Sequence, residues 1–117
     1  MFREEEFEDI RPYNDQEINP AVNRIISNPL FNKILDFLFP VGEHDQIKQK
    51  LAVTSTVAGF QLGLMHPLVS SIARKTSDGL FSDGFEQINP GTPYLFVSNH
   101  RDIVLDSAFL QMLLIDH

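Results

Sequence analysis

The clearest hydrophobic pattern in the chain is PLFNKILDFLFP, at residues 29–40. Its apolar residues recur at helical spacing on one broad face, and polar residues occupy the other face. The Asn-Pro pairs at 19–20 and 28–29 are typical helix starts, and Pro40 is a typical stop. We predict a helix here whose apolar face packs in a core, although such a face can also dock on a membrane or on a partner domain. The apolar positions are Leu30, Phe31, Ile34, Leu35, Phe37 and Leu38.

A second apolar stretch covers residues 51–73 and contains no charged residue. Its length would suffice to span a bilayer, but serine, threonine and glutamine dilute it, and His66 and Pro67 interrupt it. We therefore predict two helices, broken near residues 63–67, that are buried or lie at an interface. The second helix is expected to end at Lys75, ahead of Gly79.

The pattern changes after residue 79. The run YLFV at residues 94–97 is aromatic and β-branched, and Pro93 and Ser98 flank it, which predicts a buried strand. Residues 104–115 then show helical spacing. Since a strand needs neighbours, residues 80–81 are the candidate for a second one. The predicted fold class is α/β, with a mostly helical region at 1–78 followed at 79–117 by the first strand–loop–helix of an α/β domain.

Composition narrows the classes of function. The chain has no cysteine, which excludes disulfides, thiolate metal sites and cysteine nucleophiles. Most of the net charge of −7 comes from residues 1–17, an acidic start that we expect to be a solvated tail or first turn. No basic surface is evident, so nucleic acid is not an expected partner. The acidic start also differs from a secretory signal, which begins with a basic region.

A polar cluster follows the predicted strand, in the stretch VSNHRDIVLD at residues 97–106. A strand that ends at His100 and turns into a helix places the imidazole at the carboxyl end of a sheet, where clefts of α/β folds lie. Histidine is the usual general base near neutral pH, and a carboxylate on one ring nitrogen fixes its tautomer. Asp102 and Asp106 are four residues apart, so either could reach His100 from the first turn of a helix. Free N–H groups of that turn, with Arg101 beside them, suit a phosphate.

The same residues also have a purely structural interpretation. Asp102 is a suitable N-cap, Asp106 is a favourable acid in a first helical turn, and His100 can be a hydrogen-bonded loop residue. Spacing alone favours this structural interpretation, because one histidine near one aspartate in a loop is a weak signal. No metal is expected at any of the four histidines, which lack the spacing of metal ligands.

A longer match favours the chemical interpretation. Residues 84–106, GFEQINPGTPYLFVSNHRDIVLD, resemble the opening of the glycerolipid acyltransferase family, which includes lysophosphatidic acid and glycerol-3-phosphate acyltransferases. That family shows a glycine, a Glu-x-(Ile/Leu) turn, a strand ending in Asn-His, and a histidine and an aspartate separated by four residues. Gly84, Glu86, Ile88, Pro93 and the run FVSNH match in order and spacing. The start FEDIRPYND also looks like bacterial proteins of this group that carry a helical region ahead of the motif.

The resemblance implies a mechanism, its substrates and a location. His100 would take a proton from a glycerol hydroxyl, whose oxygen attacks the thioester of acyl-CoA or acyl-carrier protein. The acceptor would be a glycerol-phosphate or a lysophospholipid, with Arg101 as a candidate substrate-binding residue. No cofactor is implied beyond the acyl donor, which is a co-substrate. The implied location is cytoplasmic, peripheral at the inner face of the membrane.

The acid of the pair is out of the family's register. Four intervening residues would place it at Leu105, whereas Asp106 comes one residue later and Asp102 comes earlier. One extra residue in the loop would restore the geometry for Asp106, so we favour Asp106 as the orienting acid, with Asp102 as the alternative. The resemblance also implies a downstream Phe-Pro-Glu-Gly-Thr-like segment that binds phosphate and closes the site. No such segment follows the motif in this sequence.

Two classes of function therefore remain. The first is the N-terminal portion of a glycerolipid O-acyltransferase, a fragment that we expect to be inactive alone because it lacks preorganised substrate contacts. The alternative is a non-catalytic helical module that binds a membrane or a partner through residues 30–39 and 51–73.

Overall fold

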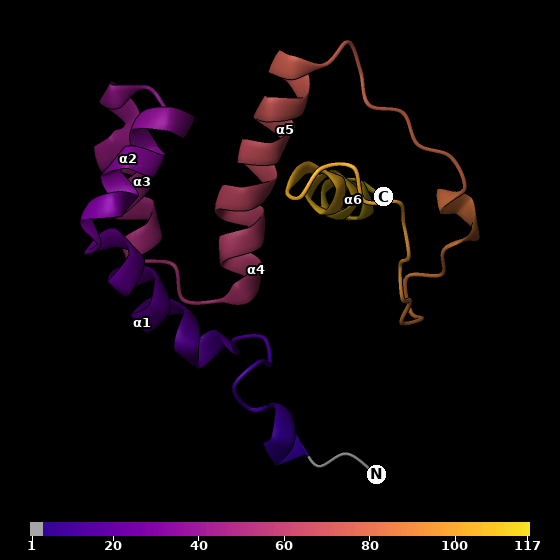
Figure 1. Cartoon of the computed structure of the whole chain (residues 1–117), viewed down its shortest axis with the longest axis horizontal. Helices are drawn as coiled ribbons and strands as arrows, with labels where there is room; N and C mark the ends of the chain where they lie inside the picture. The colour runs from indigo at the N-terminus through magenta and orange to yellow at the C-terminus, as the bar shows by residue number, and fades with distance from the viewer. Residues whose placement is uncertain (1–3) are drawn as a thin grey trace. The chain divides into compact units, whose positions relative to one another are not determined.

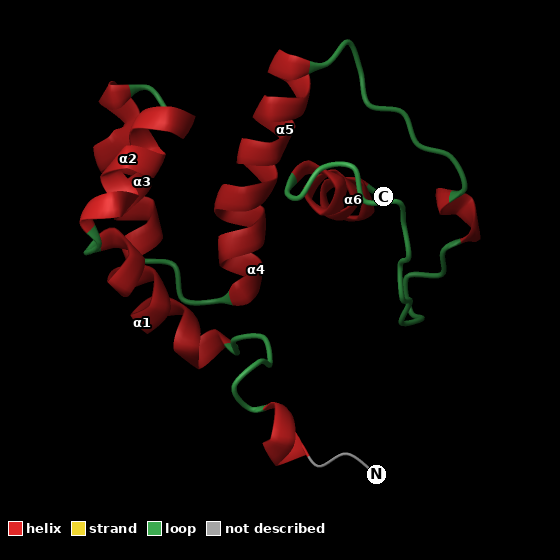
Figure 2. Cartoon of the chain, viewed as in Figure 1, coloured by secondary structure: helices red, strands yellow, loops and turns green. Residues whose placement is uncertain are grey.

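The computed structural model describes residues 4–117, which form helices joined by turns and extended segments (Figures 1 and 2). The chain divides into two compact units, one ending at Leu64 and the other comprising Met65–His117. Arg3, part of the acidic start, lies outside the described residues. The elements are η1 (Glu4–Phe7), α1 (Asp15–Ile26), α2 (Pro29–Leu38), η2 (Val41–Glu43), α3 (His44–Ala52), α4 (Val57–Phe60), η3 (Gln61–Met65), α5 (His66–Thr76), η4 (Phe85–Gln87) and α6 (Leu105–Asp116).

The predicted α/β fold is wrong. Residues 4–117 contain no β-strand, and Figure 2 accordingly shows only helices and loops. Residues 94–97, the predicted buried strand, lie exposed in a segment that pairs with no other part of the described chain. Aromatic and β-branched residues favour an extended backbone, but a strand also requires a neighbour to satisfy its N–H and C=O groups. Residues 80–81, the candidate neighbour, are not paired with this segment either.

Helix α1 begins earlier than the sequence predicted. Asn14 is its N-cap and accepts a hydrogen bond from the backbone of Gln16, while the Glu17 carboxylate accepts one from the backbone N–H of Asn14 at 2.8 Å. This reciprocal capping box satisfies N–H groups that a helix start leaves free. Pro20, predicted as the first residue of a helix, lies inside α1 instead. Its missing N–H leaves the Gln16 carbonyl without the usual helical donor.

The predicted start of α2 is confirmed. Asn28 caps the helix by accepting a hydrogen bond from Leu30 N at 2.9 Å, and Pro29 is its first residue. The broad apolar face, however, is only partly used in packing. Phe31 and Leu35 are buried, whereas several other apolar side chains of α2 are exposed.

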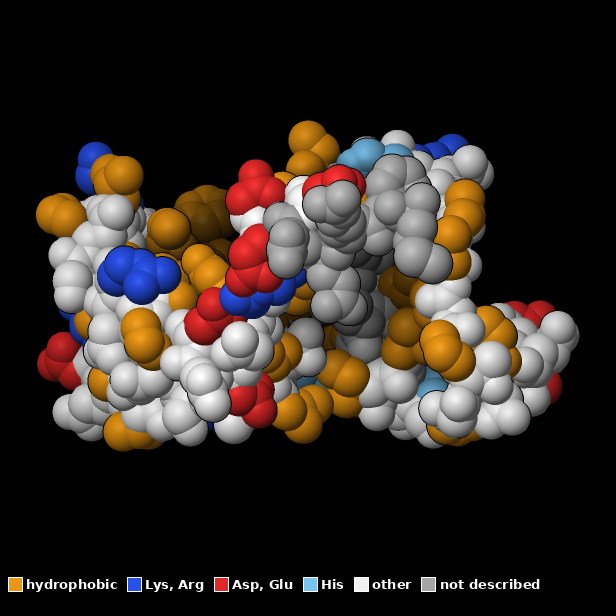
Figure 3. All heavy atoms as spheres, turned by 90° about the horizontal axis from the view of Figure 1, so that it is seen from below, with side chains coloured by type: hydrophobic (Ala, Val, Ile, Leu, Met, Phe, Trp, Pro, Cys, Tyr) orange, Lys and Arg blue, Asp and Glu red, His pale blue; other side chains and the backbone are white. Residues whose placement is uncertain are grey.

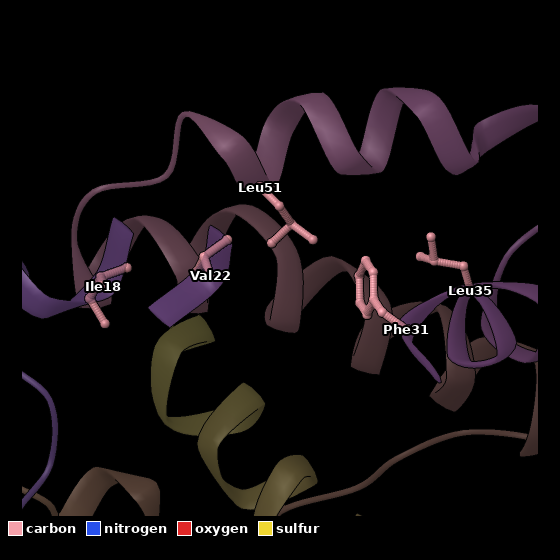
Figure 4. Close-up of a cluster of buried hydrophobic side chains, with 5 residues drawn as sticks. All are labelled: Ile18, Val22, Phe31, Leu35 and Leu51. Carbon is pink, nitrogen blue, oxygen red and sulfur yellow. The ribbon is translucent and has the colours of Figure 1, made fainter. Parts of the chain in front are cut away.

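The core of the first unit is assembled from α1, α2 and α3. Its buried residues are Ile18, Val22, Phe31, Leu35 and Leu51 (Figure 4). The 3.6-residue repeat of the helix explains why these residues are buried together. Ile18 and Val22 lie one helical turn apart, as do Phe31 and Leu35, so each pair shares one face of its helix. Leu35 is the most enclosed, with 1% of its surface exposed.

Two polar side chains of α1 hold the loop between α3 and α4. The Asn19 amide donates to the carbonyls of Ala52 and Thr54, at 2.9 and 3.1 Å. The Asp15 carboxylate accepts from Val57 N at 2.8 Å. Asn19 therefore binds carbonyls at the end of α3, and Asp15 binds a free N–H at the start of α4.

The apolar stretch at residues 51–73 departs from regular helix where a break was predicted. Helix α3 ends at Ala52, and η3 is a π-helical turn between α4 and α5. Pro67, in the first turn of α5, lacks the N–H that would bond to the Gly63 carbonyl, and the π-helical turn lies directly before α5. Among the described residues, no helix is both long and apolar enough to cross a membrane.

The second unit has a small core of its own. Val69 and Ala73 of α5 and Met112 of α6 are buried, and Ala108 and Phe109 pack against them. The predicted helix at 104–115 is confirmed to within one residue at each end. Helix α6 is thereby held against α5.

Candidate active site

His100 lies in the segment that leads into α6. The sequence placed this residue at the carboxyl end of a sheet, and the absence of any strand in residues 4–117 makes that placement wrong. The side chain is 64% exposed, so the imidazole faces solvent and is not enclosed in a cleft. Any substrate that meets His100 in this conformation approaches it on an open surface.

Asp106, the favoured partner, belongs to the first turn of α6 and points back toward His100. Its Oδ2 atom lies 3.6 Å from Nδ1 of His100. The same oxygen accepts hydrogen bonds from the backbone N–H groups of Arg101 at 2.6 Å and Asp102 at 2.9 Å. The bonds from Asp102 and Arg101 stabilise the ionised carboxylate and lower the pKa of Asp106 below its ordinary value. The acid that would orient His100 is therefore itself fixed by the backbone.

The distance to His100 is slightly longer than a hydrogen bond. Catalytic hydrogen bonds are often long before substrate binds, and they shorten in the substrate complex. In the tautomer that carries its hydrogen on Nδ1, this N–H would be the one nearest the carboxylate, and Nε2 would be the proton acceptor.

Asp102, the alternative partner, has a different role. Its Oδ1 atom accepts from Leu105 N at 2.7 Å and from Val104 N at 2.9 Å. These bonds satisfy free N–H groups at the start of α6, and they lower the pKa of Asp102. Asp102 makes no ion pair with a described histidine, whereas Asp106 lies against His100. The structural interpretation suits Asp102, and the geometry favours Asp106 as the neighbour of the imidazole.

The turn before α6 determines which residue of that helix lies beside His100. Residues 103–104 form a turn directly before α6. After this turn Asp106, the second residue of α6, lies next to His100, and Leu105 lies half-buried. Five intervening residues therefore give a histidine–aspartate pair here.

The expected phosphate site at the start of α6 is filled by the chain itself. Four N–H groups, those of Arg101, Asp102, Val104 and Leu105, donate to the two aspartates. Two carboxylates at this position also repel an anion. The remaining cationic candidate is the exposed Arg101 side chain, which makes no ion pair with any residue in the described range 4–117.

A cavity of about 720 Å³ lies elsewhere in the second unit, between the loop at 82–96 and the end of α6. Phe85 stacks on His117 at one side of it, with ring centroids 4.3 Å apart. Tyr94 and Phe96 also line it, but His100 does not. The candidate base and this cavity are thus different places on the surface of this unit.

Sequence reasoning missed a second histidine–aspartate pair. Nε2 of His66, at the start of α5, lies 2.7 Å from Oδ1 of Asp116, at the end of α6. The residues are 50 positions apart, so only the packing of α5 on α6 brings them together. Within the described residues, no group of three or more histidine, aspartate or glutamate side chains is arranged to hold a metal.

Comparison with protein-family models, with curated proteins and with solved structures finds no match to this chain.

Proposed function

We propose that the protein transfers a fatty acyl group to the hydroxyl of a glycerol-phosphate or lysophospholipid, with His100 as general base. The observation that carries this proposal is the placement of Nδ1 of His100 3.6 Å from a carboxylate oxygen that the backbone holds in place. A carboxylate at one ring nitrogen favours the tautomer whose other nitrogen is free to accept a proton. The resemblance of residues 84–106 to glycerolipid acyltransferases supplies the reaction class.

The proposed acyl transfer needs no cofactor. Nε2 of His100 takes the proton of the acceptor hydroxyl as its oxygen attacks the thioester carbonyl of acyl-CoA or acyl-carrier protein. The C–S bond breaks, the new ester C–O bond remains, and the imidazolium returns the proton to the leaving thiolate. Asp106 stabilises the imidazolium between these two proton transfers.

Arg101 is the residue we assign to the anionic part of a substrate. Its side chain is exposed next to His100, and guanidinium groups bind phosphate in a planar, two-pronged geometry. We place the reaction at the cytoplasmic face of a membrane, since an enzyme that acts on lysophospholipids must reach them in a bilayer.

The test uses the product of the complete reading frame, because the resemblance implies substrate contacts downstream of the histidine. Acyl transfer from radiolabelled acyl-CoA and acyl-carrier protein is measured with glycerol 3-phosphate and lysophosphatidic acid as acceptors. We expect His100→Ala to lower kcat by roughly 100-fold or more, in the range typical of a lost general base. Turnover that is unchanged in His100→Ala would sink the proposal.

Two matched variants separate the roles of the acids. Asp106→Asn keeps an oxygen that can accept the two backbone bonds but removes the charge, and it should lower kcat. Asp102→Asn keeps the cap of α6 and should leave kcat nearly unchanged. A long-range ¹H–¹⁵N NMR spectrum of the His100 ring adds a readout independent of turnover. Above neutral pH, Asp106→Asn should lower the population of the Nδ1–H tautomer, and Asp102→Asn should not.

A second candidate function is supported by the exposed side of α2. Leu30, Ile34 and Phe37 occupy one stripe of this helix, and all three are exposed. Hydrophobic side chains also reach the surface elsewhere on the face of the molecule drawn in Figure 3. An amphipathic helix with such a stripe suits the interface of a bilayer. We infer that α2 can attach the protein to membranes whether or not it catalyses acyl transfer.

Co-sedimentation with phosphatidylcholine vesicles tests this attachment. Phe37→Ser removes the most exposed aromatic of the stripe and should reduce the bound fraction. Phe81→Ser, at a similarly exposed phenylalanine outside both α2 and residues 51–73, is the control. Equal binding of both variants and the parent protein would argue against α2 as the attachment surface.

A further inference from the structure

Residues 94–97 carry the sequence pattern of a strand, but they form an irregular segment with no strand beside it. From Tyr94 to His100, the N–H and C=O groups make no hydrogen bond with any other described residue. Water can satisfy these exposed groups, but an unpaired segment of this kind is also a ready template for another chain, because a second strand satisfies both donor and acceptor groups along it. The free groups therefore suit an extended polypeptide as the occupant.

The exposure of the side chains alternates as it does in a strand with one covered face. Leu95 and Val97 are 90% and 86% exposed, whereas Tyr94 and Phe96 are 46% and 44% exposed. Tyr94 and Phe96 also contact each other, with ring centroids 6.1 Å apart, and both line the cavity beside α6. One face of the segment thus rests on its own unit, and the other face is bare and apolar.

We propose that residues 94–97 of two copies of this chain pair as antiparallel strands, with Phe96 opposite Phe96 of the second copy. Residues directly opposite each other in an antiparallel pair share a face. In this register Leu95 lies opposite Val97 of the second copy, twice in the dimer. The two bare apolar faces then form one continuous surface, and the two aromatic faces remain on the opposite side.

The charge pattern favours a second copy as the occupant. The chain carries a net charge of −7, which opposes self-association in general, yet residues 87–100 contain no aspartate, glutamate, lysine or arginine. Two such segments meet without charge repulsion along their whole length. A two-fold axis also makes the contact self-complementary, so it closes at a dimer. Because a two-stranded ribbon is marginal alone, the dimer is expected at high protein concentration.

Sedimentation velocity over about a hundredfold range of concentration measures the association. The parent chain should shift from monomer to dimer. Leu95→Lys and Val97→Glu should each weaken the dimer by about tenfold, since each destroys both Leu95–Val97 cross-strand contacts. The double variant Leu95→Lys/Val97→Glu places a glutamate opposite each introduced lysine, and it should recover most of the lost dimer affinity. Phe81→Lys, at an exposed apolar residue outside the segment, is the matched control and should associate like the parent.

The absence of native cysteine allows the register to be read directly. Phe96→Cys should form a disulfide-linked dimer on mild oxidation, far faster than Phe81→Cys. Hydrogen exchange in the concentrated protein should protect alternate amides of the segment, either those of Leu95 and Val97 or those of Tyr94 and Phe96. A chain that stays monomeric at all concentrations would overturn the proposal. So would a double variant no better than its single variants, or equal cross-linking at positions 81 and 96.

Discussion

Nε2 of His66 lies 2.7 Å from Oδ1 of Asp116, across the contact between the start of α5 and the end of α6. This pair is tighter than that of His100 and Asp106, which are 3.6 Å apart. Ser70 and Met112 extend the same contact, with Oγ 3.2 Å from the methionine sulfur. The pair therefore belongs to the packing of the second unit and fixes the helix to which Asp106 is attached.

A double-mutant cycle measures what this pair contributes. His66→Ala and Asp116→Asn should each lower the free energy of unfolding by about 0.5–1 kcal/mol, because both side chains are partly exposed. The double variant should cost less than the sum of the two, since either change alone already breaks the contact. Denaturant unfolding gives the three values. Strict additivity would show that the two side chains do not interact in solution.

The burial pattern of α2 predicts that mutations at two neighbouring residues have very different effects on stability. Leu35→Ala should destabilise the first unit by about 2–5 kcal/mol, because it empties the most enclosed position of the core. Ile34→Ala, at the adjacent exposed position, should change stability by less than about 0.5 kcal/mol. Thermal and denaturant unfolding of both variants, followed by circular dichroism, makes the comparison. Similar losses in both variants would contradict the packing of α2 described above.

The Asn19 amide is expected to matter for stability although it is far from any proposed chemistry. Asn19→Ala removes the two bonds to the carbonyls of Ala52 and Thr54, and it should cost about 1–3 kcal/mol. Native-state hydrogen exchange should show faster exchange at the loop between α3 and α4 than in the parent. Ser27→Ala, which removes a local bond within α1, should leave that loop unchanged.

The capping hydrogen bonds at the start of α1 are predicted to persist at low pH. The bonds from the Arg11 side chain and the Asn14 backbone lower the pKa of Glu17 from its ordinary value of 4.5 to about 2. A depressed pKa gives stability that is complete above 4.5 and is lost as the pH falls through about 2. Amide chemical shifts of residues 14–17 should therefore remain helical through pH 4. Glu17→Gln should abolish this dependence, and a native titration near 4.5 in the parent would contradict the capping box.

Local sequence patterns predicted the helices of this chain better than they predicted its fold class. The Asn-Pro pair at 28–29 and the apolar spacing after it gave α2 correctly, because capping and periodicity act within a few residues. The Asn-Pro pair at 19–20 gave a wrong helix start. The capping box of Asn14 and Glu17 starts α1 earlier, and the Asn19 side chain bonds to the end of α3 instead. Whether residues 94–97 become a strand depends on a partner segment, which no local pattern contains.

The candidate site was predictable to the extent that it is local in sequence. His100, Asp102 and Asp106 lie within seven consecutive residues, so the sequence alone showed that either aspartate could partner the histidine. The sequence did not show which of the two carboxylates lies next to the imidazole. Backbone hydrogen bonds decide that geometry, because Asp102 takes the N–H groups at the start of α6 and Asp106 turns back toward His100. The pair of His66 and Asp116 had no local signal, because it depends on helix packing across 50 positions.

The same backbone bonds predict how Asp106 responds to acid. Hydrogen bonds from the N–H groups of Asp102 and Arg101 lower its pKa below the ordinary value of 3.8. The stabilisation of the turn at 100–106 should therefore be complete above pH 3.8 and fade only as the pH falls through the lower, native pKa. Carboxyl ¹³C shifts of Asp106 report its ionisation, and the amide shifts of Arg101 and Asp102 should move with it. Asp106→Asn should remove the transition from those two amides, whereas His100→Ala should keep it. Amide shifts that move at or above pH 3.8 in the parent would show that the carboxylate is not held by the backbone, and the orientation of His100 would then need another cause.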